Sequence, residues 1–325
     1  MKNGFMLDEI VSQTMGKTEG FINIARKPDG SNVKIPVVVI EGKESGQVLL
    51  VDAGTHGDEY EGTQAVINIS KKINPDELKG TLVLIPTLNV DAFSVNSRVS
   101  PLDHANLNRI FPGTEDKYIT QRIARIYLDR VVKYADCMIS FHGGGTALHL
   151  EPIIGYLPPS DEMGMKTMKL AKAFGVSVLW RMQNLPFDGV SVMEAIKLGI
   201  PAILPEIGSH CSRFDHWDKH VDLCYNGIIN VMKELGMLKG EAKMLDKYCD
   251  VELNYIHTSI GGIHTPMYKK NDFVKGGEVL ANISDLFGHT IHQIIAPYDG
   301  VVVGYYSIPV INPGDWSYLF GKPVA

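Results

Sequence analysis

The apolar positions of this chain follow two different patterns that meet near residue 245. Before that point, short apolar runs of strand length alternate with longer segments whose apolar residues recur at helical spacing. From residue 246 onward the apolar segments are short, frequent glycines separate them, and no segment has a convincing helical period. This change predicts an α/β domain at residues 1–245 and a small all-β domain at residues 246–325.

The first part of the chain predicts an ordered alternation of elements after a helical lead-in over residues 1–20. The apolar runs that predict strands cover residues 21–25, 33–41, 47–53, 81–88, 135–141, 176–180 and 200–205. The amphipathic segments that predict helices cover residues 63–72, 117–132, 163–174, 192–198 and 218–235. Strands separated by helices favour a largely parallel sheet covered by helices.

Composition narrows the class of protein. The chain has 325 residues, of which 45% are apolar, so it can bury a full core and carry a second small domain. Its net charge of −6 argues against nucleic acid or an anionic membrane surface as the main partner. No apolar run reaches the roughly 18–20 residues that span a bilayer. With four cysteines that lack metal-binding spacing, we expect reduced thiols and a cytoplasmic protein without a nucleic-acid or membrane partner.

Side chains able to bind a metal follow three of the predicted strands. His56 and Glu59 come after one buried strand, in a segment bounded by glycines that permit a tight turn into the next helix. His142 follows a second strand, and Glu206 ends a third. Ligands of open α/β sheets bind beyond the carboxyl ends of the strands, so we expect these four side chains to converge. A His–Glu pair with a distant His is the ligand set of one class of catalytic zinc site.

Two other motifs compete for the chemistry. Residues 142–145 read His-Gly-Gly-Gly and are similar to the oxyanion loop of α/β-hydrolase esterases, but the chain has no G-x-S-x-G nucleophile motif. His216 and His220 are four positions apart and could chelate a metal on one helix face. They lack the glutamate of H-E-x-x-H and have charged flanks. We interpret them, with His210 nearby, as the start of a surface helix.

Four motifs together resemble the succinylglutamate desuccinylase/aspartoacylase family, which comprises zinc amidohydrolases related to the metallocarboxypeptidases. The motifs are His-Gly-Asp-Glu at residues 56–59, Asn-Leu-Asn-Arg-Ile-Phe-Pro-Gly at 106–113, Phe-His-Gly-Gly at 141–144 and Pro-Glu-Ile-Gly at 205–208. Their order, spacing and residue types agree over nearly the whole chain. The resemblance implies a carboxypeptidase-like mixed sheet with helices on both faces, followed by a barrel-sandwich-like β domain.

The resemblance also implies roles for the candidate residues. One zinc ion per chain would be held by His56, Glu59 and His142. Glu206 would act as the catalytic carboxylate, which takes a proton from the attacking water and passes it to the leaving amine.

Three residues of the polar segment 96–113 complete the implied site. Asn108 and Arg109 would clamp the α-carboxylate of the substrate, because arginine presents a rigid fork of donors to a carboxylate. Arg98 is our candidate for the arginine that stabilises the oxyanion. Taken without the resemblance, the same segment is more typical of a solvated polar loop.

The implied reaction is hydrolysis of the amide bond of a small N-acyl amino acid. Members that act on acidic substrates have a second arginine about ten residues before the catalytic glutamate, whereas residues 193–197 contain none here. This leaves room for a neutral or basic substrate, such as the N-acetyl-diaminobutyrate of ectoine breakdown. A metallocarboxypeptidase acting on peptide C-termini and a catalytically silent binding protein are the alternatives.

The C-terminal part resembles a biotinyl/lipoyl-type half-barrel over residues 268–281 and 296–302. A carrier domain of that type needs a lysine at its hairpin tip, and residues 284–290 contain none. We therefore expect this part to wall the mouth of the active site or to form a subunit contact in a homo-oligomer. Tyr298 could reach the site, although a turn tyrosine is the simpler interpretation.

Overall fold

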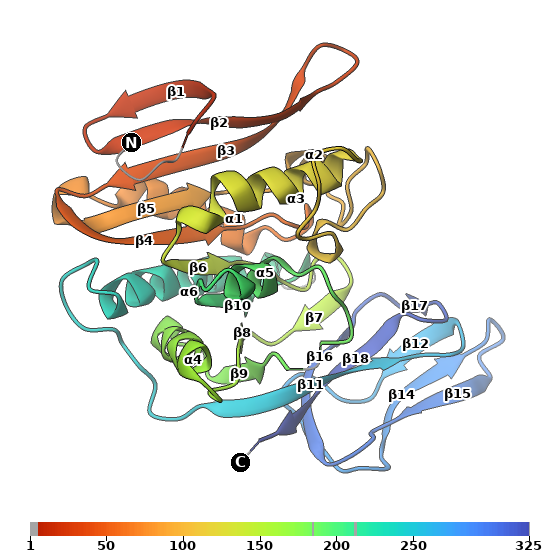
Figure 1. The fold of residues 1–325 in the computed structure, drawn as a ribbon. Coiled ribbons are helices and arrows are strands. Elements are labelled where there is room, and N and C mark those ends of the chain that lie inside the picture. The colour runs from red at the N-terminus through yellow and green to blue at the C-terminus, as the bar shows by residue number, and fades with distance from the viewer. Residues whose placement is uncertain (1–5, 184, 211–212, 325) are drawn as a thin grey trace.

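The computed structural model describes residues 6–183, 185–210 and 213–324 (Figure 1). The chain begins with three antiparallel strands, β1 (Glu9–Thr14), β2 (Lys17–Arg26) and β3 (Asn32–Glu41). The hairpin of β2 and β3 confirms the predicted strands, but the helical lead-in was wrong. The segment over β1 has no buried residue that could form the apolar stripe of a helix, and it pairs with β2 through a turn at Gly16, whose φ is 73°.

A large mixed sheet runs through the molecule, with strand order β1-β2-β3-β5-β4-β6-β10-β8-β9-β11-β18-β16-β13. Its centre is parallel and consists of β5 (Lys79–Ile85), β4 (Glu44–Asp52), β6 (Cys137–Ser140) and β10 (Ala202–Glu206). Beyond this centre the direction changes, because β8 (Ile153–Tyr156) pairs antiparallel with β10 and parallel with β9 (Val178–Arg181). The mixed sheet that the resemblance implied is confirmed, whereas the largely parallel sheet expected from the alternation alone was wrong.

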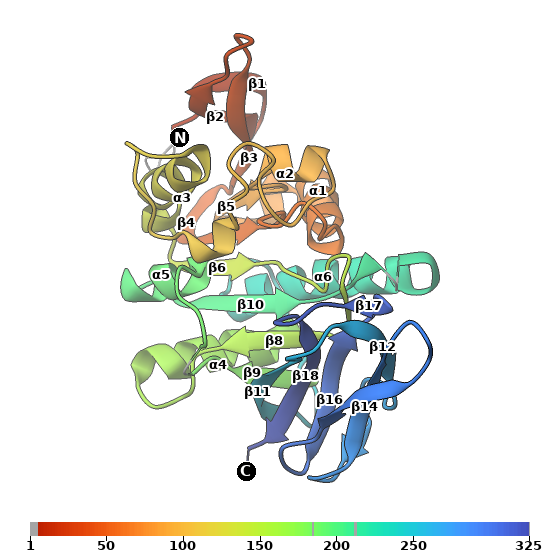
Figure 2. The same ribbon diagram turned by 90° about the vertical axis from the view of Figure 1, so that its right-hand side faces the viewer.

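Helices cover both faces of this sheet, as expected (Figures 1 and 2). On one face α1 (Glu61–Lys72), α4 (Glu162–Phe174) and α6 (Arg213–Glu234) pack together, and on the other lie α3 (Ile119–Arg130) and α5 (Ser191–Lys197). Strand β4 shows how its residues divide between the two faces. Leu50 belongs to the core under α3 and α5, whereas Leu49 and Val51 belong to the core under α1, α4 and α6.

The C-terminal part contains strands and no helix among its described residues, as the sequence predicted. Three of its longer strands, β11 (Cys249–His257), β16 (Gly300–Tyr306) and β18 (Trp316–Pro323), continue the large sheet, and the short β13 (Phe273–Val274) follows them. A second sheet contains β12 (Gly262–Pro266), β14 (Val279–Ser284), β15 (Thr290–Ile295) and β17 (Val310–Ile311). A separate core fills this part, and a boundary near residue 245 stays a prediction because β11 is hydrogen-bonded to β9.

Two features of this fold position the residues that carry chemistry. The parallel strands β4, β6 and β10 end at the same edge of the sheet, where their following loops meet. Strand β7 (Leu148–Leu150) pairs with β16 and so brings the C-terminal part against this edge (Figure 1).

In the part of the chain that the structure describes, no helix is both long enough and apolar enough to cross a bilayer.

Candidate functional site

Two histidines and a glutamate converge at the carboxyl ends of β4 and β6. Ligand atoms of His56, Glu59 and His142 all lie within 4.8 Å of one another, and all three residues are buried. His56 Nδ1 lies 2.8 Å from Glu59 Oε1, and His142 Nδ1 lies 3.1 Å from Glu59 Oε2. The two Nδ1 atoms are 3.1 Å apart. Among the described residues, this is the group of three His, Cys, Asp or Glu side chains compact enough to hold a metal ion.

The loop between β4 and α1 places His56 and Glu59 on one turn, as predicted. Glycine is required at Gly57, because a Cβ atom there would lie 2.1 Å from the carbonyl carbon of Ala92. Gly54 adopts a φ of 64°, in the left-handed region that favours glycine. The chain can therefore turn within a few residues and enter the helix with the side chains of His56 and Glu59 both buried.

His142 and Glu206 come from neighbouring strand ends that are tied by backbone hydrogen bonds. The His142 N–H donates to the Pro205 carbonyl at 2.8 Å, and the Ile207 N–H donates to the His142 carbonyl at 2.9 Å. Gly143 allows this close approach, since a Cβ atom there would lie 2.8 Å from the Ile207 oxygen. This arrangement brings the side chains of His142 and Glu206 into one cavity.

Electrostatics set the protonation of these four groups. Burial lowers the pKa of His56 to about 4, so its imidazole is neutral at pH 7. Burial raises the pKa of Glu59, but the adjacent imidazoles of His56 and His142 outweigh it, and the pKa lies below its ordinary value. For His142, burial lowers the pKa, yet the Glu59 carboxylate outweighs burial and raises it. Burial raises the pKa of Glu206 to about 7, where a carboxylate can exchange protons at neutral pH.

An asparagine that the sequence prediction missed orients the first histidine. Asn106 Oδ1 lies 3.0 Å from His56 Nε2, which leaves Nδ1 to face Glu59 and His142. The same Oδ1 accepts a hydrogen bond from the Asn108 N–H at 3.0 Å. The spacing of Asn106 and Asn108 in the quoted motif was visible in the sequence, but only the fold brings Asn106 to His56.

The residues of the polar segment occupy different sides of the site. Arg98 Nη1 donates to Glu59 Oε1 at 3.0 Å. Asn108 Oδ1 accepts from the Ser191 N–H at 3.0 Å, and its Nδ2 lies 3.4 Å from His142 Nε2. The guanidinium of Arg109 lies over the ring of Phe187, 3.6 Å from its centre. Arg98, Asn108 and Arg109 therefore all border the cavity that contains Glu206 and His142.

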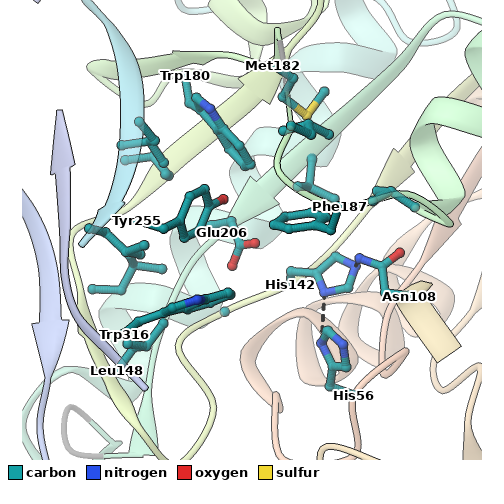
Figure 3. A pocket seen from close by; sticks show the side chains of 18 of the residues that line it. His56, Asn108, His142, Leu148, Trp180, Met182, Phe187, Glu206, Tyr255 and Trp316 are labelled. Carbon is teal, nitrogen blue, oxygen red and sulfur yellow. Dashed lines mark hydrogen bonds between the residues drawn. The ribbon is translucent and has the colours of Figure 1, made fainter. Parts of the chain in front are cut away.

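This cavity has a volume of about 50 Å³ and lies between the two histidines, His56 and His142, and the C-terminal strands (Figure 3). Four aromatic side chains that the sequence analysis did not select line it: Trp180, Phe187, Tyr255 and Trp316. Tyr255 and Trp316 belong to β11 and β18, so the C-terminal part forms one wall of the cavity. This agrees with the first of the two roles expected for that part. No sequence motif marks these residues, because they come from separate strands and loops.

Two further expectations have different outcomes. The pair His216 and His220 lies in α6, but His220 is 3% exposed, so the interpretation of both as surface residues was wrong for His220. Its surroundings include His149 and Lys270, whose charges act on it from outside α6. Tyr298 packs against Phe320, with ring centres 5.4 Å apart, and does not line the cavity. This result agrees with the simpler interpretation of a turn tyrosine.

Comparison with known proteins gives consistent matches. A sequence model described as "Succinylglutamate desuccinylase/Aspartoacylase catalytic domain" matches residues 45–224. The chain is 27% identical over 320 residues to the N-alpha-acetyl-L-2,4-diaminobutyric acid deacetylase of Halomonas elongata, covering 95% of this chain and 92% of that protein.

Solved structures share the fold over their whole length. The product-bound ectoine utilization protein EutE (DoeB) from Ruegeria pomeroyi has a TM-score of 0.88 at 25% identity, with 99% of each chain covered. A succinylglutamate desuccinylase from Silicibacter sp. TM1040 also has a TM-score of 0.88, at 24% identity, with 98% of this chain and 100% of that chain covered.

Proposed function

The chain belongs to the succinylglutamate desuccinylase/aspartoacylase family, and on that premise we propose that it is a zinc-dependent deacylase of small N-acyl amino acids. Membership of this family identifies the chain as an amidohydrolase that acts on N-acyl amino acids. The observation that carries the rest of the proposal is the group His56, Glu59 and His142, which shares a cavity with Glu206.

The donor atoms of this group fit zinc. Two imidazole nitrogens and one carboxylate are a ligand set that leaves a fourth tetrahedral position open in catalytic sites. The contact of Asn106 with His56 Nε2 fixes the ring with Nδ1 free for the metal. His56 is neutral at pH 7 and Glu59 is ionised, as metal ligands must be. In this proposal, one ion is held by His56, Glu59 and His142.

The reaction needs an activated water and a group that moves its proton. Zinc, when bound, lowers the pKa of water towards about 7 and polarises the acyl carbonyl. Glu206 accepts the proton of the attacking water and delivers it to the amide nitrogen, so that the C–N bond breaks and the amine leaves neutral. The pKa of Glu206, raised to about 7 by burial, suits both transfers.

The remaining polar residues bind and orient the substrate. Arg109 and Asn108 hold the α-carboxylate, and the stacking of Arg109 on Phe187 keeps its guanidinium in one plane. Arg98 borders the cavity and donates to Glu59, and its guanidinium would stabilise the negative charge that develops on the acyl oxygen. The scissile amide then lies between Glu206 and the proposed metal ligands His56, Glu59 and His142.

The size of the cavity favours a small substrate over a peptide. Its volume of about 50 Å³ and its wall from β11 and β18 suit a small substrate better than an extended polypeptide. This observation favours a deacylase over the metallocarboxypeptidase alternative. Nα-acetyl-2,4-diaminobutyrate is a second candidate substrate, supported by the relative from Halomonas elongata.

A hydrolysis screen with a metal control tests the proposed function. Zinc-loaded protein and protein stripped with a chelator are incubated with N-acetyl, N-succinyl and N-formyl amino acids, and the released amine is quantified. We expect hydrolysis that disappears with the chelator and returns with zinc. Release of amine at the same rate by the stripped protein would contradict the metal-dependent mechanism.

A further inference from the structure

The cavity beside Glu206 is far more apolar than the sequence motifs around it suggest. Besides the residues already assigned a role, its wall includes the side chains of Trp180, Met182, Phe187, Leu253, Tyr255 and Leu319. Met182 is 1% exposed and Trp180 is 4% exposed, so these side chains belong to the interior of the protein and not to its rim. Figure 3 shows Trp180, Met182, Phe187 and Tyr255 on the side of Glu206 away from His56.

The position of Arg109 indicates which part of the substrate enters this wall. Arg109 stacks on Phe187, and Phe187 in turn contacts Tyr255 with ring centres 5.7 Å apart. If Arg109 holds the α-carboxylate, as the proposed function states, the side chain on the same carbon atom lies next to these rings. The acyl group has another exit, because a second cavity of about 310 Å³ adjoins the first and shares Arg98, Leu148 and Trp316 with it.

The charges around the cavity disfavour an ionised side chain. Among the described residues that line it, Glu206 is the single carboxylate, and the arginines are Arg98 and Arg109. These three groups already have roles in the proposed reaction. A substrate ammonium in this cavity would have no carboxylate other than Glu206, because Asp58 and Asp315 line the second cavity, which we assign to the acyl group. A second substrate carboxylate would compete for Arg98 and Arg109, and burying an unpaired charge is costly.

The aromatic side chains do not form a free cage for a cation. Arg109 already covers the face of Phe187. Tyr255 lies at the centre of the cluster, since its ring centre is 6.4 Å from that of Trp180 and 4.8 Å from that of Trp316. The rings thus pack mainly against one another, and the surface they leave is suited to hydrocarbon or thioether groups.

From this wall, and on the basis of the proposed function, we infer that the enzyme selects N-acyl amino acids with an uncharged apolar side chain, of which leucine and methionine are examples. The side chain lies against Trp180, Met182 and Tyr255, and the acyl group points towards Arg98 and the second cavity. This class differs from the diaminobutyrate derivative named for the Halomonas relative, whose side chain carries an ammonium group.

A substrate panel tests the inference with the unmodified zinc-loaded protein. The values of kcat/KM are measured for the N-acetyl derivatives of L-leucine, L-methionine, L-2,4-diaminobutyrate and L-aspartate. We expect the leucine and methionine derivatives to exceed both charged ones by at least about tenfold, since even one methylene in an apolar pocket is worth about that factor. A higher value for a charged derivative would overturn the inference and leave the proposed function intact. No hydrolysis of any derivative would overturn both.

A binding measurement and a variant pair give independent readouts. The zinc-loaded Glu206→Gln protein should bind N-acetyl-leucine at least about tenfold more tightly than N-acetyl-diaminobutyrate in calorimetry. Met182→Glu should reverse this preference by supplying a carboxylate, provided that its zinc content matches that of the parent. Met165→Glu, which adds the same charge at a position 51% exposed on α4, is the matched control and should leave the preference unchanged. Equal binding of both ligands by the Glu206→Gln protein would contradict the inference.

Discussion

His142 and Glu206 form an isolated parallel bridge between the ends of β6 and β10. The two residues are 64 positions apart in the chain, yet the N–H and the carbonyl of His142 are hydrogen-bonded to Pro205 and Ile207, the two neighbours of Glu206. A proposed metal ligand and the proposed proton carrier are therefore mounted on one rigid unit. Their separation is fixed by the sheet and not by a loop.

Replacement of the proposed proton carrier should separate metal binding from turnover. In Glu206→Gln the amide cannot accept the proton of water, so kcat should fall by about 10²- to 10⁴-fold. Zinc content, measured by mass spectrometry, should stay near one ion per chain because Glu206 is not in the ligand group. His142→Ala is the matched variant and should lose zinc. A Glu206→Gln protein as active as its parent would exclude Glu206 as the base.

Loss of the contact on the far side of His56 should weaken metal binding. Asn106→Ala removes the oxygen that lies 3.0 Å from His56 Nε2. Zinc affinity, measured by competition with a chelating dye, should fall by about 10- to 100-fold, as is typical for such outer contacts. Asn106→Asp keeps an oxygen at this position and should retain most of the affinity. An unchanged affinity in Asn106→Ala would show that His56 needs no such support.

The proposed carboxylate clamp should depend on the shape of the guanidinium. Arg109→Lys keeps the positive charge but loses the planar fork and the stacking on Phe187. We expect kcat/KM to fall by at least about tenfold, with KM increased, in steady-state assays of N-acyl amino acid hydrolysis. The fall in kcat/KM should nearly vanish for a substrate whose α-carboxylate is replaced by an amide. An equal loss for both substrates would contradict a role in carboxylate binding.

The buried His220 should make the protein less stable in mild acid. Burial and the positive charges of Lys270, His216, Lys219 and His149 lower its pKa from the ordinary value of about 6.5 to about 4. As pH falls from about 6.5 to 4, this imidazole is protonated in the unfolded chain but stays neutral in the folded protein. The free energy of unfolding therefore decreases over this pH range. His220→Leu should show a smaller decrease of the urea midpoint between pH 7.5 and 5. An identical decrease in both proteins would exclude His220 as the source.

A hydrogen-bonded group under the site should contribute to stability. The Tyr127 hydroxyl donates to Asp52 Oδ2 at 2.8 Å, and the Ser140 hydroxyl donates to Asp52 Oδ1 at 2.8 Å, with all three residues buried. Tyr127→Phe leaves one carboxylate oxygen without this donor and should lower the free energy of unfolding by about 1–3 kcal/mol. Tyr118→Phe, at a side chain 75% exposed, should have no comparable effect on the urea midpoint.

The sequence was most informative where interactions are local. The short spacing of His56 and Glu59 and the strand before them place both side chains on one turn, because glycines permit that turn and nothing distant is needed. Strong apolar runs also gave the central strands β4, β6 and β10 within a few residues. The positions of His142 and Glu206 after two of these strands then predicted where their side chains would lie, since the carboxyl ends of parallel strands meet at one edge of the sheet.

The sequence failed where a segment acquires its structure from a partner. Strand β1 has no buried face of its own and is stabilised by pairing with β2, so its local pattern did not reveal it. Strand β8 has only 4 residues and sits antiparallel beside β10, which made the sheet mixed where simple alternation predicted parallel strands. Pairing of this kind depends on the register between distant segments, which local propensity does not encode.

The sequence by itself determined where the candidate metal ligands and the candidate proton carrier stand, because they follow recognisable strands and lie in motifs that resemble a known family. Only the tertiary structure decided what surrounds them. Tyr255 on β11 and Trp316 on β18 reach the cavity because the C-terminal strands continue the sheet past β9. An aromatic residue in a strand has no signature that distinguishes a ligand wall from an ordinary core. The proposed choice of substrate therefore depends on long-range packing, whereas the proposed reaction can be predicted from short motifs.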